Sequence, residues 1–131
     1  ACVDVKINVI KPTGYVFSDR RMKRSGMDYL DLANLIEHEN YESFLEDMTK
    51  KNKRLLYLTP HAETSFVDFE YSNDDVLVMG RESSGMDKDD AAKIKHHLTI
   101  PMNPNARSIN VAIACSMVTT EALRQLNGFN R

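Results

Sequence analysis

Hydrophobic stretches alternate along this chain with polar stretches that contain glycine or proline. From Val5 to Ile10 hydrophobic and polar residues take turns, and this period of two predicts a strand with one buried face. Compact apolar runs at Leu55–Thr59, Val76–Met79 and Leu98–Ile100 predict three further strands, each followed directly by proline or glycine. The pattern therefore predicts at least four strands.

Other segments have the spacing of helices. Hydrophobic residues three and four positions apart predict an amphipathic helix from about Asn40 to Lys51. A short helix is expected near Asp89–Lys95 with Asp87 as its cap, and a long one from Ser108 to Leu126, stopped by Gly128.

Two earlier segments are less clear in the pattern. Ser18 or Asp19 could cap a short helix that ends at Gly26. The run Leu30–Ile36 fits either a helix or a strand.

Nearly continuous apolar strands separated by helices predict an α/β fold with a parallel sheet covered on both faces. The chain has 131 residues, which is the size of one domain spanning residues 1–131. The helix at Ser108–Leu126 is apolar almost all round through Val118, so it is expected to pack against a second copy of the chain as well as the sheet. We therefore expect a homodimer formed through the C-terminal helix.

Charge is nearly balanced overall but unevenly placed. A net charge of −2 argues against a protein that coats nucleic acid non-specifically. The segment from residue 20 to residue 24 nevertheless carries four cations, and we expect them to bind phosphates: Arg20, Arg21, Lys23 and Arg24. The second basic cluster, Lys50–Arg54, is equally well explained as the solvated face of a helix.

Hydrophobic runs and cysteines indicate the cellular compartment in which the protein is expected. It has no apolar run near the ~20 residues that a membrane span needs, and no signal-peptide pattern. Cys2 and Cys115 are far apart in the sequence and are expected to be free thiols in a cytoplasmic protein.

Ligands of open parallel sheets bind beyond the carboxyl ends of the strands. Three such ends are expected at Leu58-Thr59, at Met79-Gly80 and at Ile100 to Met102. Gly80 and Gly85 bracket a tight loop, and glycine lets a backbone approach a ligand closely. The loop matches neither of the common glycine-rich phosphate motifs, and a purely structural turn is the more frequent explanation of such spacing.

The start of the last helix is a second candidate. Ser108 at its beginning, Asn110 in its first turn and the neighbouring Arg107 could attract an anion to free backbone amides, or Ser108 could simply cap the helix. Metal binding has little support, because His96 and His97 are adjacent in an expected strand and would face opposite ways. Cys115 lies in an apolar stretch and is expected to belong to the core.

Taken together, these segments resemble a known family. The early segments Ile10–Phe17 and Arg21–Tyr29, the spacing Gly80-x-Glu-x-x-Gly85, Ile100-Pro-Met102 and Arg107-Ser-x-Asn110 occur in the order and approximate spacing of the SPOUT superfamily of RNA methyltransferases. The resemblance covers nearly the whole chain and is strongest to the SpoU/TrmH branch, in particular to its small TrmL-type tRNA wobble-nucleotide 2′-O-methyltransferases.

The resemblance implies a fold, a cofactor and a substrate. The fold would be Rossmann-like with a C-terminal trefoil knot, and S-adenosyl-L-methionine would bind in the knot loops. By position, the cofactor-binding residues would be Leu58, Thr59, Gly80, Glu82, Gly85, Ile100, Met102 and Ser108. Glu82 would organise its loop rather than act as a base, and no metal is implied.

The implied reaction is methylation of a ribose 2′-hydroxyl in tRNA at the wobble pyrimidine. Ser108 and Asn110 would position the reacting groups, and Arg20, Arg21, Lys23, Arg24 and Arg107 would bind the RNA. Other readings remain open: methylation of rRNA, of another tRNA position or of a base, or RNA binding without catalysis. The residues do not distinguish cytidine from uridine.

The chain departs from the family pattern in three places. The family's first strand and first motif, which ends in a functionally important arginine, are expected before Ala1. Thr120 stands where close relatives often carry tyrosine, and the stretch Asp87–Lys95 is slightly short.

Overall fold

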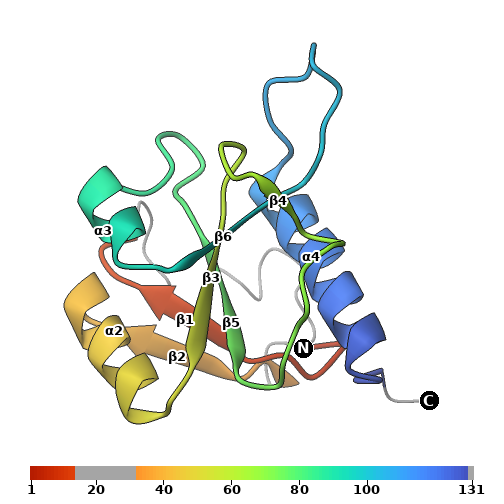
Figure 1. The fold of residues 1–131 in the computed structure, drawn as a ribbon. Helices are drawn as coiled ribbons and strands as arrows, with labels where there is room; N and C mark the ends of the chain where they lie inside the picture. The colour runs from red at the N-terminus through yellow and green to blue at the C-terminus, as the bar shows by residue number, and fades with distance from the viewer. Residues whose placement is uncertain (14–31, 130–131) are drawn as a thin grey trace, which may run out of the picture. The chain divides into compact units, whose positions relative to one another are not determined.

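The computed structural model describes residues 1–13 and 32–129, and its chain divides into two compact units between Asn52 and Lys53. A single domain over residues 1–131 stays a prediction. The helix predicted between Ser18 and Gly26 lies outside the described residues. The elements are drawn in Figure 1.

The described residues of the first unit form two parallel strands and one helix. Strand β1 (Ile7–Ile10) pairs with β2 (Leu35–His38) from Ile7 opposite Leu35 to Ile10 opposite His38. The ambiguous run at Leu30–Ile36 therefore ends in a strand, because its last residues find hydrogen-bonding partners in β1. The buried His38 adds a side-chain hydrogen bond of 2.8 Å to Asn8.

Helix α2 (Tyr41–Lys50) confirms the predicted amphipathic helix. Asn40 accepts a hydrogen bond from the Ser43 backbone, and the Ser43 side chain accepts one from Asn40, which completes a capping box. Phe44 and Met48 are buried on the apolar face. The helix thus begins directly after Asn40, whose side chain satisfies one of its first free amides.

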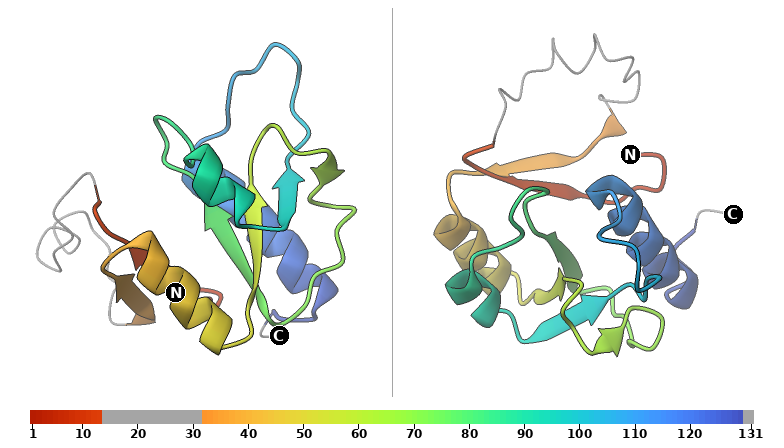
Figure 2. Two further views of the ribbon diagram at one scale, coloured as in Figure 1. Left: turned by 60° about the vertical axis from the view of Figure 1, so that its left-hand side comes forward. Right: turned by 90° about the horizontal axis from the view of Figure 1, so that it is seen from above.

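The second unit is a four-stranded parallel sheet with the strand order β4-β6-β3-β5. Its strands are β3 (Arg54–Leu58), β4 (Thr64–Ser65), β5 (Asp75–Met79) and β6 (His96–Thr99). Helices α3 (Lys88–Ala92) and α4 (Val111–Gln125) lie on opposite sides of this sheet (Figure 2). The predicted parallel α/β architecture is confirmed for this unit. The trefoil knot implied by the resemblance stays a prediction.

Three features of the second unit differ from the sequence prediction. Strand β6 begins two residues earlier than expected, because His96 and His97 pair with Leu56 and Tyr57. Helix α3 follows Asp87 as predicted, although the Asp87 side chain makes no capping hydrogen bond. Strand β4 was not predicted, since two polar residues carry no periodic signal.

The core of the second unit lies between the sheet and α4. Its buried members are Leu56, Tyr71, Leu98, Ile100, Ala114 and Val118. Burying a side chain the size of valine or leucine contributes about 1.5–3 kcal/mol, so this face anchors α4 to the sheet. Within the described residues no helix is long and apolar enough to cross a membrane.

Candidate functional site

The carboxyl ends of three neighbouring strands meet at one edge of the second sheet. Leu58, the last residue of β3, is in register with Met79 of β5 and with Leu98 of β6. The Thr59 backbone amide continues the ladder with a 2.9 Å hydrogen bond to the Leu98 carbonyl. The loops that follow these three strands leave at the same edge (Figure 1), as predicted for ligand-binding loops.

The loop after β5 is a tight turn that requires both of its glycines. Arg81 and Gly85 exchange backbone hydrogen bonds of 3.1 and 2.8 Å. Gly85 has a positive φ of 68°, and a Cβ at Gly80 would lie 2.8 Å from the Gly85 Cα. The two glycines therefore let the turn close on itself.

The tip of this turn presents backbone to solvent. Glu82, Ser83 and Ser84 are exposed, and in the described part of the chain their amides donate no backbone hydrogen bond. Free amides of this kind can bind the edge of a ligand ring. The role predicted for the Glu82 side chain stays a prediction.

Apolar side chains come from the two other strand ends. Leu58 and Met102 are half-buried, whereas Ile100 and Thr59 are buried. A small-molecule site typically combines such apolar side chains with a few backbone donors. The residues at this edge therefore fit an adenosine-containing cofactor, with partly accessible apolar surface beside the open amides of the turn.

The start of the last helix differs from the prediction. Asn110, and not Ser108, is the N-cap of α4, and its Oδ1 accepts hydrogen bonds from Ala112 (3.0 Å) and Ile113 (3.3 Å). Arg107 and Ser108 are exposed and precede the helix. Two amides proposed for anion binding are thus already occupied by the cap, and an anion at Ser108 would not meet them.

The second basic cluster is largely paired with acids. Lys51 contacts Asp47 at 2.7 Å, and Lys53 contacts Asp74 at 2.8 Å. Arg54 forms two hydrogen bonds to Asp75, and the pKa of Arg54 is raised chiefly by that hydrogen bonding. This pairing favours the structural explanation of the cluster. The first cluster, Arg20, Arg21, Lys23 and Arg24, lies outside the described residues.

The two adjacent histidines point to opposite faces of β6, as predicted. His96 packs edge-on against Phe69, and His97 packs against Tyr57. Burial, followed by the positive charge of Arg54, lowers the pKa of His96 and so favours its neutral form. Among the residues that the structure describes, no group of three or more His, Cys, Asp or Glu side chains could hold a metal ion.

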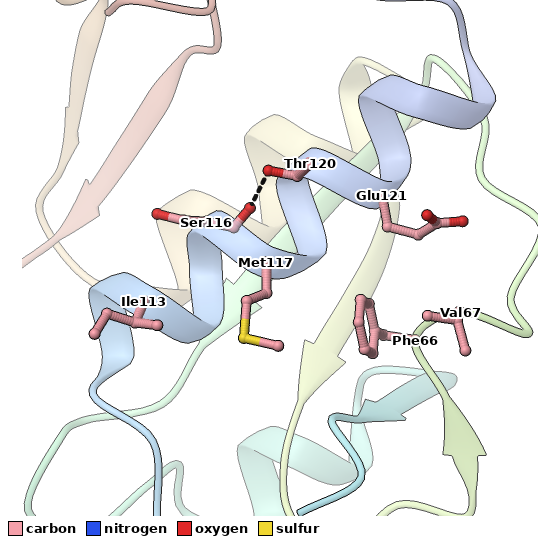
Figure 3. Close-up of a pocket in the computed structure, with 7 residues that line it drawn as sticks. All are labelled: Phe66, Val67, Ile113, Ser116, Met117, Thr120 and Glu121. Carbon is pink, nitrogen blue, oxygen red and sulfur yellow. Dashed lines mark hydrogen bonds between the residues drawn. The ribbon is translucent and has the colours of Figure 1, made fainter.

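An apolar groove lies beside α4, between this helix and the segment that follows β4 (Figure 3). Ile113 and Met117 are 57% and 38% exposed, and they lie one turn apart beside Phe66 and Val67. Ser116, Thr120 and Glu121 complete the lining, and the Thr120 hydroxyl donates to the Ser116 carbonyl at 2.7 Å. The sequence pattern gives no signal for Phe66 and Val67 as site residues, because they follow the unpredicted strand β4.

One charged residue lines this groove. Hydrogen bonds from Arg124 and then from Gln125 lower the pKa of Glu121 to about 2. Glu121 is therefore ionised at neutral pH, and it also accepts two hydrogen bonds from the Arg124 guanidinium. The groove thus combines an apolar floor with a fixed ion pair at one end.

Comparisons with known proteins agree on one family. The model of the SpoU rRNA Methylase family matches residues 1–120. A tRNA (cytidine(34)-2'-O)-methyltransferase of Beijerinckia indica is 40% identical over 126 residues, which are 96% of this chain and 79% of the relative.

Solved structures give the same picture. One, solved to study the 2-OH methylation of C/U34 on tRNA, has a TM-score of 0.86 at 32% identity and covers 94% of this chain and 80% of its own. The SpoU methyltransferase AviRb of Streptomyces viridochromogenes, in complex with AdoMet, has a TM-score of 0.80 at 20% identity. That match covers 92% of this chain and 49% of the other, and it supports the fold alone.

Proposed function

Because the chain belongs to the SpoU methylase family, we propose that it is an RNA methyltransferase that methylates the ribose 2′-hydroxyl of the wobble pyrimidine in tRNA. The observation that carries the proposal is the relative from Beijerinckia indica, a tRNA (cytidine(34)-2'-O)-methyltransferase that is 40% identical over 126 residues, nearly the whole of this chain. The loops at the strand ends support the proposal, because they bring apolar side chains and open backbone amides together as a cofactor site requires.

S-adenosyl-L-methionine, when bound, supplies an electrophilic methyl group. The protein therefore needs to bind the cofactor, align its methyl group with the ribose hydroxyl and exclude water. Leu58, Ile100 and Met102 would contact its apolar surface, and Gly80 and Gly85 would hold the turn whose amides meet its polar edge. Asn110 and Ser108 would position the attacking ribose hydroxyl. Thr59 is buried next to Leu58 and would support the floor of the site.

The direct test is a methyl-transfer assay with undermodified tRNA and labelled S-adenosylmethionine, followed by digestion to nucleosides and mass spectrometry. We expect a 2′-O-methylated pyrimidine that maps to position 34, and the product identifies it as cytidine or uridine. Transfer of the label to rRNA but not to tRNA would support the rRNA alternative suggested by the family's description. A methylated base would contradict ribose methylation, and RNA binding without transfer would support a silent binding module.

We expect the first basic cluster to bind tRNA phosphates. Replacing Arg21 and Arg24 together with alanine should lower tRNA affinity and reduce the slope of log K against log salt by about 2, because each phosphate contact contributes roughly 0.9. The matched control replaces Lys51 and Lys53, which removes the same charge from cations that are already paired with acids. Equal losses in both double variants would contradict a specific role for the first cluster.

The groove on α4 supports a homodimer, as the apolar pattern of this helix predicts. The exposed Ile113 and Met117 offer a second copy an apolar surface next to Phe66 and Val67. We expect sedimentation as a dimer at micromolar concentration, and a shift to monomer when Met117 is replaced by lysine. Lysine at the exposed Ala92 of α3 is the control, and a stable wild-type monomer would contradict the proposal.

We propose that the protein acts in the cytoplasm. Both cysteines are free: Cys2 is exposed and Cys115 is half-buried in α4. Unpaired thiols suit a reducing compartment.

A further inference from the structure

Tyr57 lies directly beneath the turn after β5 and is not one of the proposed cofactor-binding residues. It lies in the central strand β3 and is only 7% exposed. Its neighbours in the register are His97 on β6 and Val78 on β5. Because paired residues of parallel strands face the same side, these side chains share the sheet face opposite the α4 core.

His97 holds the Tyr57 ring in place. The two rings meet edge to face, with centroids 5.3 Å apart and planes at 89°. The His97 Nε2 lies 3.0 Å from the Ala91 carbonyl oxygen and 2.9 Å from that of Ile94. Since carbonyl oxygens only accept, Nε2 carries the proton, and the imidazole is fixed against the end of α3.

The Tyr57 hydroxyl reaches the turn itself. It accepts a hydrogen bond of 3.3 Å from the Met86 backbone amide. It would also lie 3.6 Å from a Cβ built on Gly85, so the hydroxyl is close beneath both residues. The Arg81–Gly85 hydrogen bonds are internal to the turn. Within the described part of the chain, the Tyr57 contact is the hydrogen bond that ties this turn to the sheet.

We propose that Tyr57 is a positioning residue that fixes the 80–86 turn in the conformation that binds the cofactor, with His97 holding its ring. The inference rests on the proposed function, because it takes the turn as the cofactor-binding loop. A residue with this role changes the affinity for the cofactor by altering loop order. It leaves the chemical step unchanged once the cofactor is bound.

The test is Tyr57→Phe, which keeps the ring and removes only the hydroxyl. The matched control is Tyr71→Phe: Tyr71 is also buried, and its hydroxyl donates to the Phe66 carbonyl at 2.8 Å, away from the turn. Calorimetry with S-adenosylhomocysteine measures affinity without turnover. Hydrogen exchange at the Met86 amide measures loop order independently of any ligand.

We expect Tyr57→Phe to weaken S-adenosylhomocysteine binding about fivefold, the effect of one typical hydrogen bond. KM for S-adenosylmethionine should rise by the same factor while kcat is unchanged, and exchange at Met86 should accelerate. Tyr71→Phe should match the wild type in all three measurements.

Two results would overturn the inference, and they differ from one another. Wild-type affinity and wild-type exchange in Tyr57→Phe would overturn it while leaving the proposed function intact. Failure of the unmodified protein to bind S-adenosylhomocysteine would overturn the proposed function, and the inference with it.

Discussion

Replacing Gly80 with alanine is expected to weaken S-adenosylmethionine binding at least tenfold while the protein remains folded. The added Cβ would lie 2.8 Å from the Gly85 Cα and 2.9 Å from its carbonyl carbon. These are backbone atoms, which cannot rotate away as the end of a side chain could. The turn would therefore have to open, and the paired hydrogen bonds between Arg81 and Gly85 would be lost.

Affinity is measured by calorimetry with S-adenosylhomocysteine, and stability by thermal unfolding of the same samples. The control is Ser84→Ala, which adds no atom to the turn and changes an exposed position at its tip. We expect Ser84→Ala to bind like the wild type. Normal binding by Gly80→Ala would show that the cofactor does not depend on the closed turn.

The sheet could be predicted because its strands carry a strong local signal. Apolar runs such as Leu55–Thr59 and Val76–Met79 end at proline or glycine, and burial on both faces leaves few other structures open to them. Strand β4 has no such signal. Its two polar residues form a strand because they pair with Leu98 and Thr99 of β6, and the Phe66 amide continues this pairing with a hydrogen bond to the Thr99 carbonyl.

The candidate site was predictable in place but not in detail. Parallel strands bring Leu58, Gly80 and Ile100 to one edge, so their proximity follows from the fold. The hydrogen bond between the Tyr57 hydroxyl and the Met86 amide joins residues 29 positions apart. No periodic pattern in the sequence predicts such a contact. The roles of the site residues came from the resemblance to a family.

The start of the last helix could not be predicted from hydrophobic periodicity. The apolar pattern includes Ile109, which packs against the core, so periodicity extends the helix back to Ser108. Side-chain capping decides the boundary instead, because Asn110 takes up the first free amides. The cap of α4 is therefore Asn110 and not Ser108, so the proposed positioning of the substrate falls on a residue that also caps the helix.

Replacing Asn110 with aspartate is expected to reduce methyl transfer about 100-fold, the effect of a misplaced reacting group, without destabilising the protein. Aspartate keeps the oxygen that caps α4, and its charge suits the N-terminus of a helix. It removes only the amide group that could donate to the ribose or its phosphate. Asn110→Ala should lose activity as well, and it should also lose about 1 kcal/mol of stability because the cap is gone.

Asn103→Asp is the matched control, because Asn103 Oδ1 likewise accepts a backbone hydrogen bond, from Asn105 at 2.9 Å in the loop before α4. The substitution adds the same charge to a residue with the same kind of local contact, and wild-type turnover is expected. Steady-state kinetics and thermal unfolding of the three variants separate the two roles of Asn110. If Asn110→Asp turns over at the wild-type rate, Asn110 acts only as a helix cap, and positioning of the ribose would have to come from the exposed Ser108 or from other groups.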